Sequence, residues 1–96
     1  MILVNYNDNE FYIKDNKINE WNELLKKNNN NEYGKHILSL ISDYCWCLEM
    51  CMKDGTSVIE AYKITNEASN NWNMSGFQYN QMFYWVKELW YKGDDL

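Results

Sequence analysis

The sequence predicts a mostly α-helical fold: a compact bundle of about four helices with a short N-terminal β-hairpin, for which an α+β description stays open. Three observations lead to this prediction. Apolar residues recur at helical spacing along most of the chain, two serines stand three residues before a glutamate or glutamine, and glycines follow the ends of two predicted helices. With 96 residues, 46% of them apolar, we expect a single domain over residues 1–96 with one modest core.

The hairpin is predicted at about residues 2–14. Apolar and polar residues partly alternate from Ile2 to Tyr6, and a second apolar stretch runs from Phe11 to Ile13. The polar residues 7–9 between them are typical of a turn. Because a two-stranded hairpin is only marginally stable alone, we expect it to lean on the helices.

The first helix is predicted at about residues 17–27, with Asp15 or Asn16 available as its N-terminal cap. Its apolar residues at helical spacing are Ile18, Trp21, Leu24 and Leu25. The helix is expected to stop in the asparagine run at 28–31, because these side chains compete with the backbone for hydrogen bonds.

The longest helix is predicted at residues 32–53, and Gly55 suits the left-handed position just beyond its end. One stripe of this helix is apolar and is expected to face the core: Ile37, Ile41, Tyr44, Leu48 and Cys51, flanked by Leu40 and Met52.

Capping boxes mark the start of the last two helices. Ser57 and Glu60 open a helix at about 58–69. Ser75 and Gln78 open a final helix at about 76–92, which Gly93 is expected to close.

Composition and charge exclude several classes of function. The chain has 14 acidic and 9 basic residues, a net charge of −5, and its basic residues are all lysines scattered along the sequence. Direct binding of nucleic acid is not expected, because it requires clustered Lys and Arg. No apolar run is long enough for a membrane span, and no signal peptide is recognisable, so we expect a cytoplasmic protein that does not contact the membrane.

No cofactor, metal site or catalytic group is predicted. Cys45, Cys47 and Cys51 lie too close together for a disulfide framework and are expected to pack as small apolar residues, with redox sensing left open. His36 is the single histidine, and no pattern supplies it with a nucleophile and an orienting group. We therefore expect a protein that is not an enzyme.

The aromatic content is the most informative number in the sequence: five Trp, eight Tyr and three Phe. A domain of this size has limited room to bury sixteen such side chains, so some are expected at the surface. On the last helix one broad face is expected to be core: Tyr79, Met82, Phe83, Val86, Leu89 and Trp90, with Trp85 at its edge. The stripe Phe77, Tyr84 and Tyr91 recurs every seven residues on the opposite side, and it either packs the hairpin or meets a partner.

A protein-binding site is predicted from the aromatic residues and the charges beside them. Trp46 and Met50 lie opposite the core stripe of the long helix, and Tyr and Trp are enriched in interface hot spots. The predicted anchors are Trp46, Met50, Tyr84 and Tyr91, with Asp43, Glu49 and Glu88 as polar contacts.

Part of the sequence resembles small proteins of low-GC phages and mobile elements. The resemblance is carried by three stretches: Cys47 to Tyr62, Gly76 to Gln78, and Val86 to Gly93. Proteins of this size and composition are similar in character to anti-CRISPR and other anti-defence inhibitors, which bind and block a host nuclease complex. The resemblance implies a phage-type inhibitor in the host cytoplasm whose partner is a host protein, such as a CRISPR or other defence nuclease. It implies no site residue.

Two alternatives stay open. The chain could be a homo-oligomeric structural or assembly protein, since a homodimer would use the same aromatic patches. It could also be a nucleotide-binding sponge in which aromatic rings sandwich a base, although the absence of Arg disfavours phosphate binding.

Overall fold

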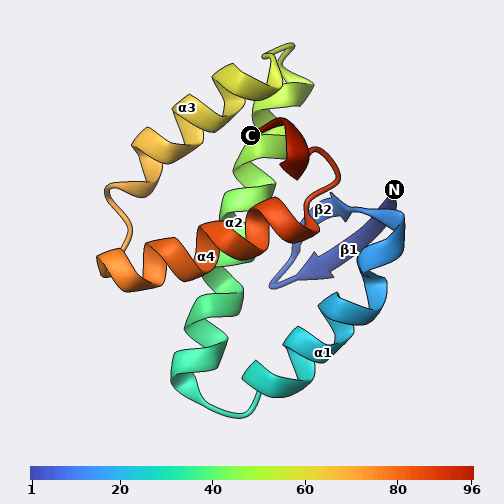
Figure 1. Cartoon of the computed structure of the whole chain (residues 1–96). Helices are drawn as coiled ribbons and strands as arrows, with labels where there is room; N and C mark the ends of the chain where they lie inside the picture. The colour runs from blue at the N-terminus through green and yellow to red at the C-terminus, as the bar shows by residue number, and fades with distance from the viewer.

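The computed structural model describes residues 1–96 and contains four α-helices and one hairpin (Figure 1). The elements are β1 (Ile2–Tyr6), β2 (Asn9–Ile13), α1 (Ile18–Asn28), α2 (Glu32–Lys53), α3 (Val58–Ser69) and α4 (Gly76–Leu89). There are also two single-turn 3-10 helices: η1 (Asp15–Lys17) precedes α1, and η2 (Gly93–Asp95) follows α4. The predicted fold class, a helical bundle with an N-terminal hairpin, is confirmed.

The hairpin is antiparallel and pairs Ile2 with Ile13 at its open end and Tyr6 with Asn9 at its turn. The turn residues Asn7 and Asp8 both have positive φ angles, 51° and 66°, a conformation that Asn and Asp tolerate best among non-glycine residues. Phe11 and Ile13 are fully buried. The hairpin therefore contributes one apolar face to the core, as its alternating pattern predicts.

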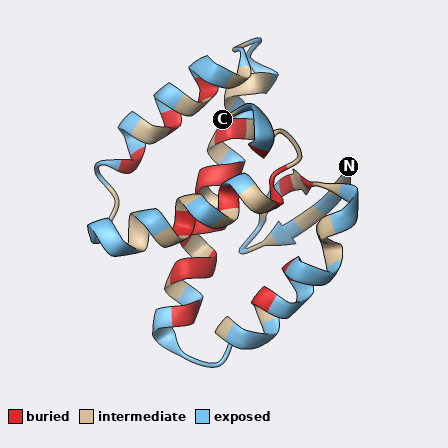
Figure 2. Cartoon of the chain, in the orientation of Figure 1, coloured by how far each residue is buried: buried red, intermediate tan, exposed pale blue.

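Helix α2 is the centre of the fold. It packs against the other three helices and both strands, and α4 lies across it (Figure 1). Figure 2 shows the buried residues gathered along the middle of α2 and on the face of α4 turned toward it. Ile37, Ile41, Tyr44 and Leu48 are buried as predicted, while Cys51 is half-buried.

Phe83 of α4 joins the three C-terminal helices through ring contacts. Its ring centroid lies 5.8 Å from that of Tyr44 on α2, 5.3 Å from that of Tyr62 on α3 and 5.9 Å from that of Tyr79. Met82 and Val86 beside it are fully buried. The predicted core face of the last helix therefore packs as expected.

The cap signals act where the sequence places them. Gly55 has φ +89°, and its N–H donates to the Met52 carbonyl at 3.0 Å while Thr56 N–H donates to the Cys51 carbonyl at 3.2 Å. These two bonds form a Schellman motif that ends α2. At the start of α4, Ser75 Oγ accepts from Gln78 N–H at 3.1 Å and Gln78 Oε1 accepts from Ser75 N–H at 2.8 Å.

The other predicted caps are incomplete or different. Ser57 Oγ accepts from Glu60 N–H at 3.2 Å, but the reciprocal bond of a capping box is absent. Neither Asp15 nor Asn16 caps α1, which corrects that prediction: both belong to η1, and Asp15 forms an ion pair with the N-terminal ammonium of Met1. Because both residues lie within η1, Lys17 and not Asp15 or Asn16 stands at the N-cap position of α1.

The last helix ends at Leu89, three residues before the predicted end at 92, and Gly93 is not its cap. Trp90 is extended and bridges to Ile13, while Tyr91 N–H donates to the Tyr12 carbonyl at 3.1 Å. The edge of β2 thus takes over the backbone groups that a longer helix would satisfy internally.

None of the helices is long and apolar enough to cross a membrane.

Candidate protein-binding surfaces

A concave surface of about 420 Å³, here called the acidic groove, lies between the hairpin and the C-terminal half of α2. Its lining residues are Leu3, Asp8, Glu10, Tyr12, Trp46, Glu49, Met50, Met52, Lys53 and Tyr91. Four of the predicted partner-binding residues are therefore brought together here from α2 and from the segment after α4: Trp46, Glu49, Met50 and Tyr91.

Apolar side chains form much of the acidic groove. Trp46 and Met50, one turn apart on α2, remain 40% and 38% exposed. Tyr12 and Tyr91 meet edge to face with their ring centroids 5.8 Å apart. Exposed large apolar side chains gathered in a hollow indicate a candidate interaction site.

Carboxylates outnumber lysines in the acidic groove. Asp8 comes from the hairpin turn, Glu10 from β2 and Glu49 from α2, whereas Lys53 is the one basic residue of the lining. An anionic ligand would meet net repulsion at this surface, and a cationic one net attraction.

Glu49 is the carboxylate of the acidic groove that is hydrogen-bonded within the fold. Its Oε2 accepts a hydrogen bond from Tyr12 N–H at 2.7 Å, which ties α2 to β2. Burial raises the pKa of Glu49, and the Tyr12 amide and Lys53 oppose that shift. The indole N–H of the buried Trp90 also favours the charged carboxylate, although it is outside hydrogen-bonding geometry. The charge of Glu49 is therefore held in place and only partly hydrated.

Asp43 lies outside the acidic groove and is engaged within the fold. Its Oδ1 accepts from Asn9 Nδ2 at 2.7 Å, and Asn7 Nδ2 donates to Ser39 Oγ at 3.1 Å beside it. Burial raises the pKa of Asp43, and the bond from Asn9 opposes the shift. These contacts attach the hairpin turn to α2.

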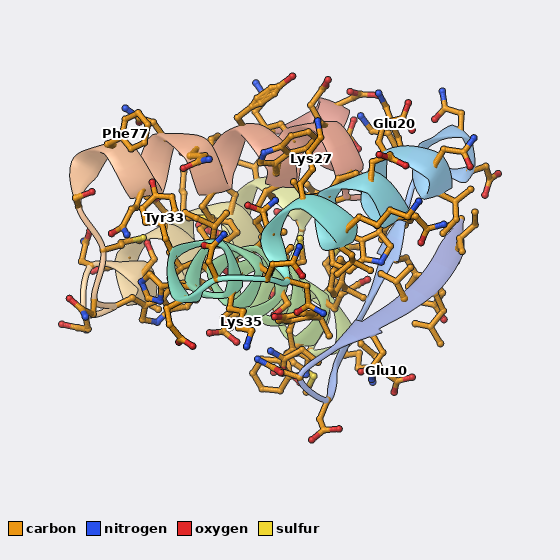
Figure 3. All side chains as sticks on the ribbon, turned by 90° about the horizontal axis from the view of Figure 1, so that it is seen from below. Glu10, Glu20, Lys27, Tyr33, Lys35 and Phe77 are labelled. Atoms are coloured by element: carbon orange, nitrogen blue, oxygen red, sulfur yellow. The ribbon has the colours of Figure 1, made fainter.

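The outer side of α4, here called the α4 face, is a second surface. Phe77 and Tyr84 are 71% and 51% exposed, and they flank a hollow of about 350 Å³ that Asn80, Gln81 and Trp85 complete. Phe77 on α4 and Glu10 at the acidic groove point to opposite sides of the molecule (Figure 3). The two surfaces therefore do not merge.

The predicted stripe of Phe77, Tyr84 and Tyr91 is wrong for its last member. Tyr91 lies beyond the end of α4 and belongs to the acidic groove, because the chain turns extended at Trp90. Tyr84 stays with Phe77 on the α4 face. Glu88, also predicted as a partner contact, is half-buried, and its Oε1 lies 3.9 Å from Nζ of Lys17 in η1.

The cysteines and the histidine make contacts within the fold and do not form a cluster. Cys45 is fully buried, and burial raises the pKa of its thiol and that of Cys47. No cluster of three or more His, Cys, Asp or Glu side chains could hold a metal ion. His36 Nε2 lies 2.8 Å from the Asn73 carbonyl oxygen and so secures the connection between α3 and α4.

Sequence reasoning missed the hairpin's share of the acidic groove, namely Leu3, Asp8, Glu10 and Tyr12. The alternation along the strands was a usable signal, because Leu3 and Tyr12 are cross-strand partners on the face opposite the buried Phe11. Which part of α2 this face would meet is a tertiary property.

Comparison with known proteins identifies a family. A family model described as Type I Thoeris inhibitor Tad4 matches residues 11–96. No curated protein and no solved structure shows detectable similarity to the chain. The matched range includes most of the lining of the acidic groove and the whole of α4.

Proposed function

The chain belongs to the Tad4 family of Type I Thoeris inhibitors, and we propose that it inhibits this defence system by binding one of its proteins through the acidic groove. Family membership makes it an anti-defence inhibitor of the phage type, which agrees with the general expectation from the sequence. The family description names Thoeris, so it corrects the narrower expectation of an anti-CRISPR protein directed at a CRISPR nuclease.

The observation that carries the proposal is that exposed apolar side chains and three carboxylates lie together in one hollow. Trp46 and Met50 offer apolar area that the fold leaves uncovered. Side chains of this kind, at the centre of a patch with a polar rim, provide most of the binding energy of protein interfaces. Glu49 lies between them on the same helix and is oriented by Tyr12, so its contact with a partner would cost little side-chain entropy.

The charge of the acidic groove supports a basic surface as its target. Three carboxylates face one lysine in the lining, and the whole chain carries a net charge of −5. Opposite charges accelerate association and set orientation, while the apolar anchors hold the complex together. Inhibition then follows from occupying a functional surface of a host protein in the host cytoplasm, and it requires no catalytic group.

A nucleotide sponge is less well supported by the same geometry. Aromatic rings suited to a base are present in the acidic groove, but Asp8, Glu10 and Glu49 would repel a phosphate and Lys53 alone would attract it. The α4 face has no basic residue in its hollow either.

The test has two stages. The chain is first co-expressed with a Type I Thoeris system in a phage-challenged host, where it should restore plaque formation. Each purified Thoeris protein is then titrated with the chain, and one of them should bind with an affinity that falls as salt concentration rises. Thermal shift with linear and cyclic nucleotides is run in parallel. Restored plaques with no binding to any Thoeris protein, together with a nucleotide-induced shift, would refute direct protein binding and favour the sponge.

A further inference from the structure

The three carboxylates of the acidic groove have no counter-ion within the fold. The ion pairs of the chain use the carboxylates of Asp15, Glu23, Glu88 and Asp94, and none of these four residues lines the groove. Lys53, the basic residue of the lining, takes part in none of these pairs. A carboxylate that is partly removed from water is stabilised when a cation approaches it, so a positively charged group of a partner would be attracted into the groove.

Glu49 is an oriented anion in the wall of the acidic groove. It is half-buried on α2, and its Oε2 accepts from Tyr12 N–H at 2.7 Å. The fully buried Trp90 has an indole N–H without a hydrogen-bond partner, and this N–H favours the charged form of Glu49. A carboxylate has about four lone-pair sites, so Glu49 keeps acceptor capacity for a donor that enters the groove.

Aromatic rings lie beside these charges. Tyr12 and Tyr91 meet at an interplanar angle of 69°, and Trp46 is 40% exposed in the same lining. The ring of Tyr91 already interacts with a cation, because Lys92 Nζ lies 5.4 Å from its centroid. Even when Lys92 is counted together with Lys53, the three carboxylates outnumber the ammonium groups at this surface.

We propose that the acidic groove binds one arginine side chain of its protein target, with the guanidinium stacked on an aromatic ring and donating to Glu49 and to a second carboxylate. The groove lies between α2 and the hairpin, so Glu49 approaches a bound group from α2 and Glu10 approaches it from β2. Glu10 projects from the hairpin on the side of the molecule away from Phe77 (Figure 3).

The mixed lining selects arginine over lysine. A guanidinium is planar, carries five N–H donors in a fixed fork and stacks on aromatic faces, so it satisfies rings and carboxylates at the same time. An ammonium is a compact and strongly hydrated point charge with three donors, which suits a site made of carboxylates alone. In the acidic groove Tyr12, Trp46 and Tyr91 provide the rings, and carboxylates from two elements provide acceptors in more than one direction.

This inference rests on the proposed function in one respect, namely that the arginine belongs to the Thoeris protein that the chain binds. Recognition of a guanidinium is a property of the groove itself and can be measured without any Thoeris protein. The two proposals therefore fail in different experiments.

Titration of the full chain with N-acetyl-L-arginine amide, followed by heteronuclear NMR, tests the recognition directly. The Trp46 indole N–H and the Tyr12 amide N–H should shift in a saturable way, because the first lies in the lining and the second is bonded to Glu49. N-acetyl-L-lysine amide carries the same charge and should bind at least about threefold more weakly. The neutral isostere N-acetyl-L-citrulline amide should give no saturable shift.

Glu49→Gln separates recognition from folding. Glutamine keeps an oxygen that can accept from Tyr12 N–H, so the variant should remain folded, which circular dichroism checks. Its affinity for the arginine amide should fall at least about fivefold, because a charged acceptor is lost. Glu67→Gln, at an exposed position on α3, makes the same change in net charge outside the groove and should bind within about twofold of wild type.

Four results would overturn the proposal: no saturable shift with the arginine amide, equal shifts with the citrulline amide, equal affinity for the arginine and lysine amides, or an equal loss in Glu49→Gln and Glu67→Gln. The Thoeris protein that binds the chain supplies the second readout. Replacing its surface arginines with lysine, one at a time, should identify a substitution that weakens binding to wild type and has little further effect on Glu49→Gln.

Binding of the Thoeris protein with no arginine coupled to Glu49 would overturn this inference and leave the proposed function standing. Arginine-specific shifts without binding to any Thoeris protein would support guanidinium recognition and refute a Thoeris protein as the target.

Discussion

Trp46→Ala probes the acidic groove most directly. A large aromatic side chain buries up to about 250 Å² when fully covered. With 40% of Trp46 exposed, about 100 Å² remains for a partner to cover. At about 25 cal/mol per Å², that area is worth up to about 2.5 kcal/mol of binding free energy. We expect a loss of between about 1 and 2.5 kcal/mol, or roughly 5- to 60-fold in Kd.

The buried part of the same side chain affects the fold, so binding and folding have to be measured separately. The rest of the Trp46 side chain is covered by the fold, and its removal should lower the free energy of unfolding by on the order of 1–2 kcal/mol. Calorimetric titration against the Thoeris protein that binds the chain should therefore be run on material whose helical circular dichroism is unchanged. Urea denaturation of the same variant gives the folding cost.

The matched control is Ile64→Ala, on α3. Ile64 is a large apolar side chain of similar exposure, 48%, outside the acidic groove. Its removal should leave the Kd within about twofold of wild type, which is the usual range for a residue outside the hot spot. Equal Kd values for Trp46→Ala and wild type, or an equal loss in both variants, would show that the acidic groove is not the binding surface.

Three further outcomes follow from the structure. Glu49→Gln should weaken target binding at neutral pH and yet be at least as stable as wild type, because the carboxylate is partly desolvated. The pKa of Glu49 is raised in the folded state above the ordinary 4.5, so the folded wild type binds this proton more tightly than the unfolded chain does. The stability advantage of the variant should therefore shrink as pH falls from neutral toward 4.5. Urea denaturation at several pH values would contradict this if the difference in stability stayed constant. Gly55→Ala should cost about 1–2 kcal/mol of unfolding free energy, because an alanine at φ +89° is strained. Gly76 has open space around it and no positive φ, so Gly76→Ala should be neutral or stabilising by up to about 1 kcal/mol. Equal effects of the two substitutions in thermal melts would disprove the reasoning. Target binding should also weaken as salt rises, with a smaller dependence in Glu49→Gln than in wild type, and an unchanged salt dependence in titrations would remove Glu49 from the interface.

Much of the fold was predictable because its signals are local. The bounds of α2 and α3 coincide with the predicted 32–53 and 58–69, since Ser57 and Gly55 act within one turn of themselves. The exposure of Trp46 followed from its position opposite the core stripe of the same helix. Signals of this kind depend on residues three or four apart, and the sequence displays them directly.

The end of α4 was not predictable in this way. Its apolar pattern continues to Trp90 and Tyr91, and a local reading extends the helix through them. In the folded chain the backbone from Leu89 to Tyr91 instead bonds to Tyr12 and Lys14 at the edge of β2. That competition joins segments more than seventy residues apart, and helix periodicity contains no information about it.

By itself the sequence therefore determined the elements of this protein, the apolar stripes that build its core and the excess of aromatic residues available for binding. Only the tertiary structure decided how the excess is divided: Tyr91 joins Trp46, Glu49 and Met50 in the acidic groove, while Tyr84 stays with Phe77 on the opposite side. The physical reason is that side-chain spacing within a helix follows from backbone geometry, whereas a binding surface is made where separate elements pack together. Here that packing is set by the hairpin leaning on α2 and by the chain end pairing with β2.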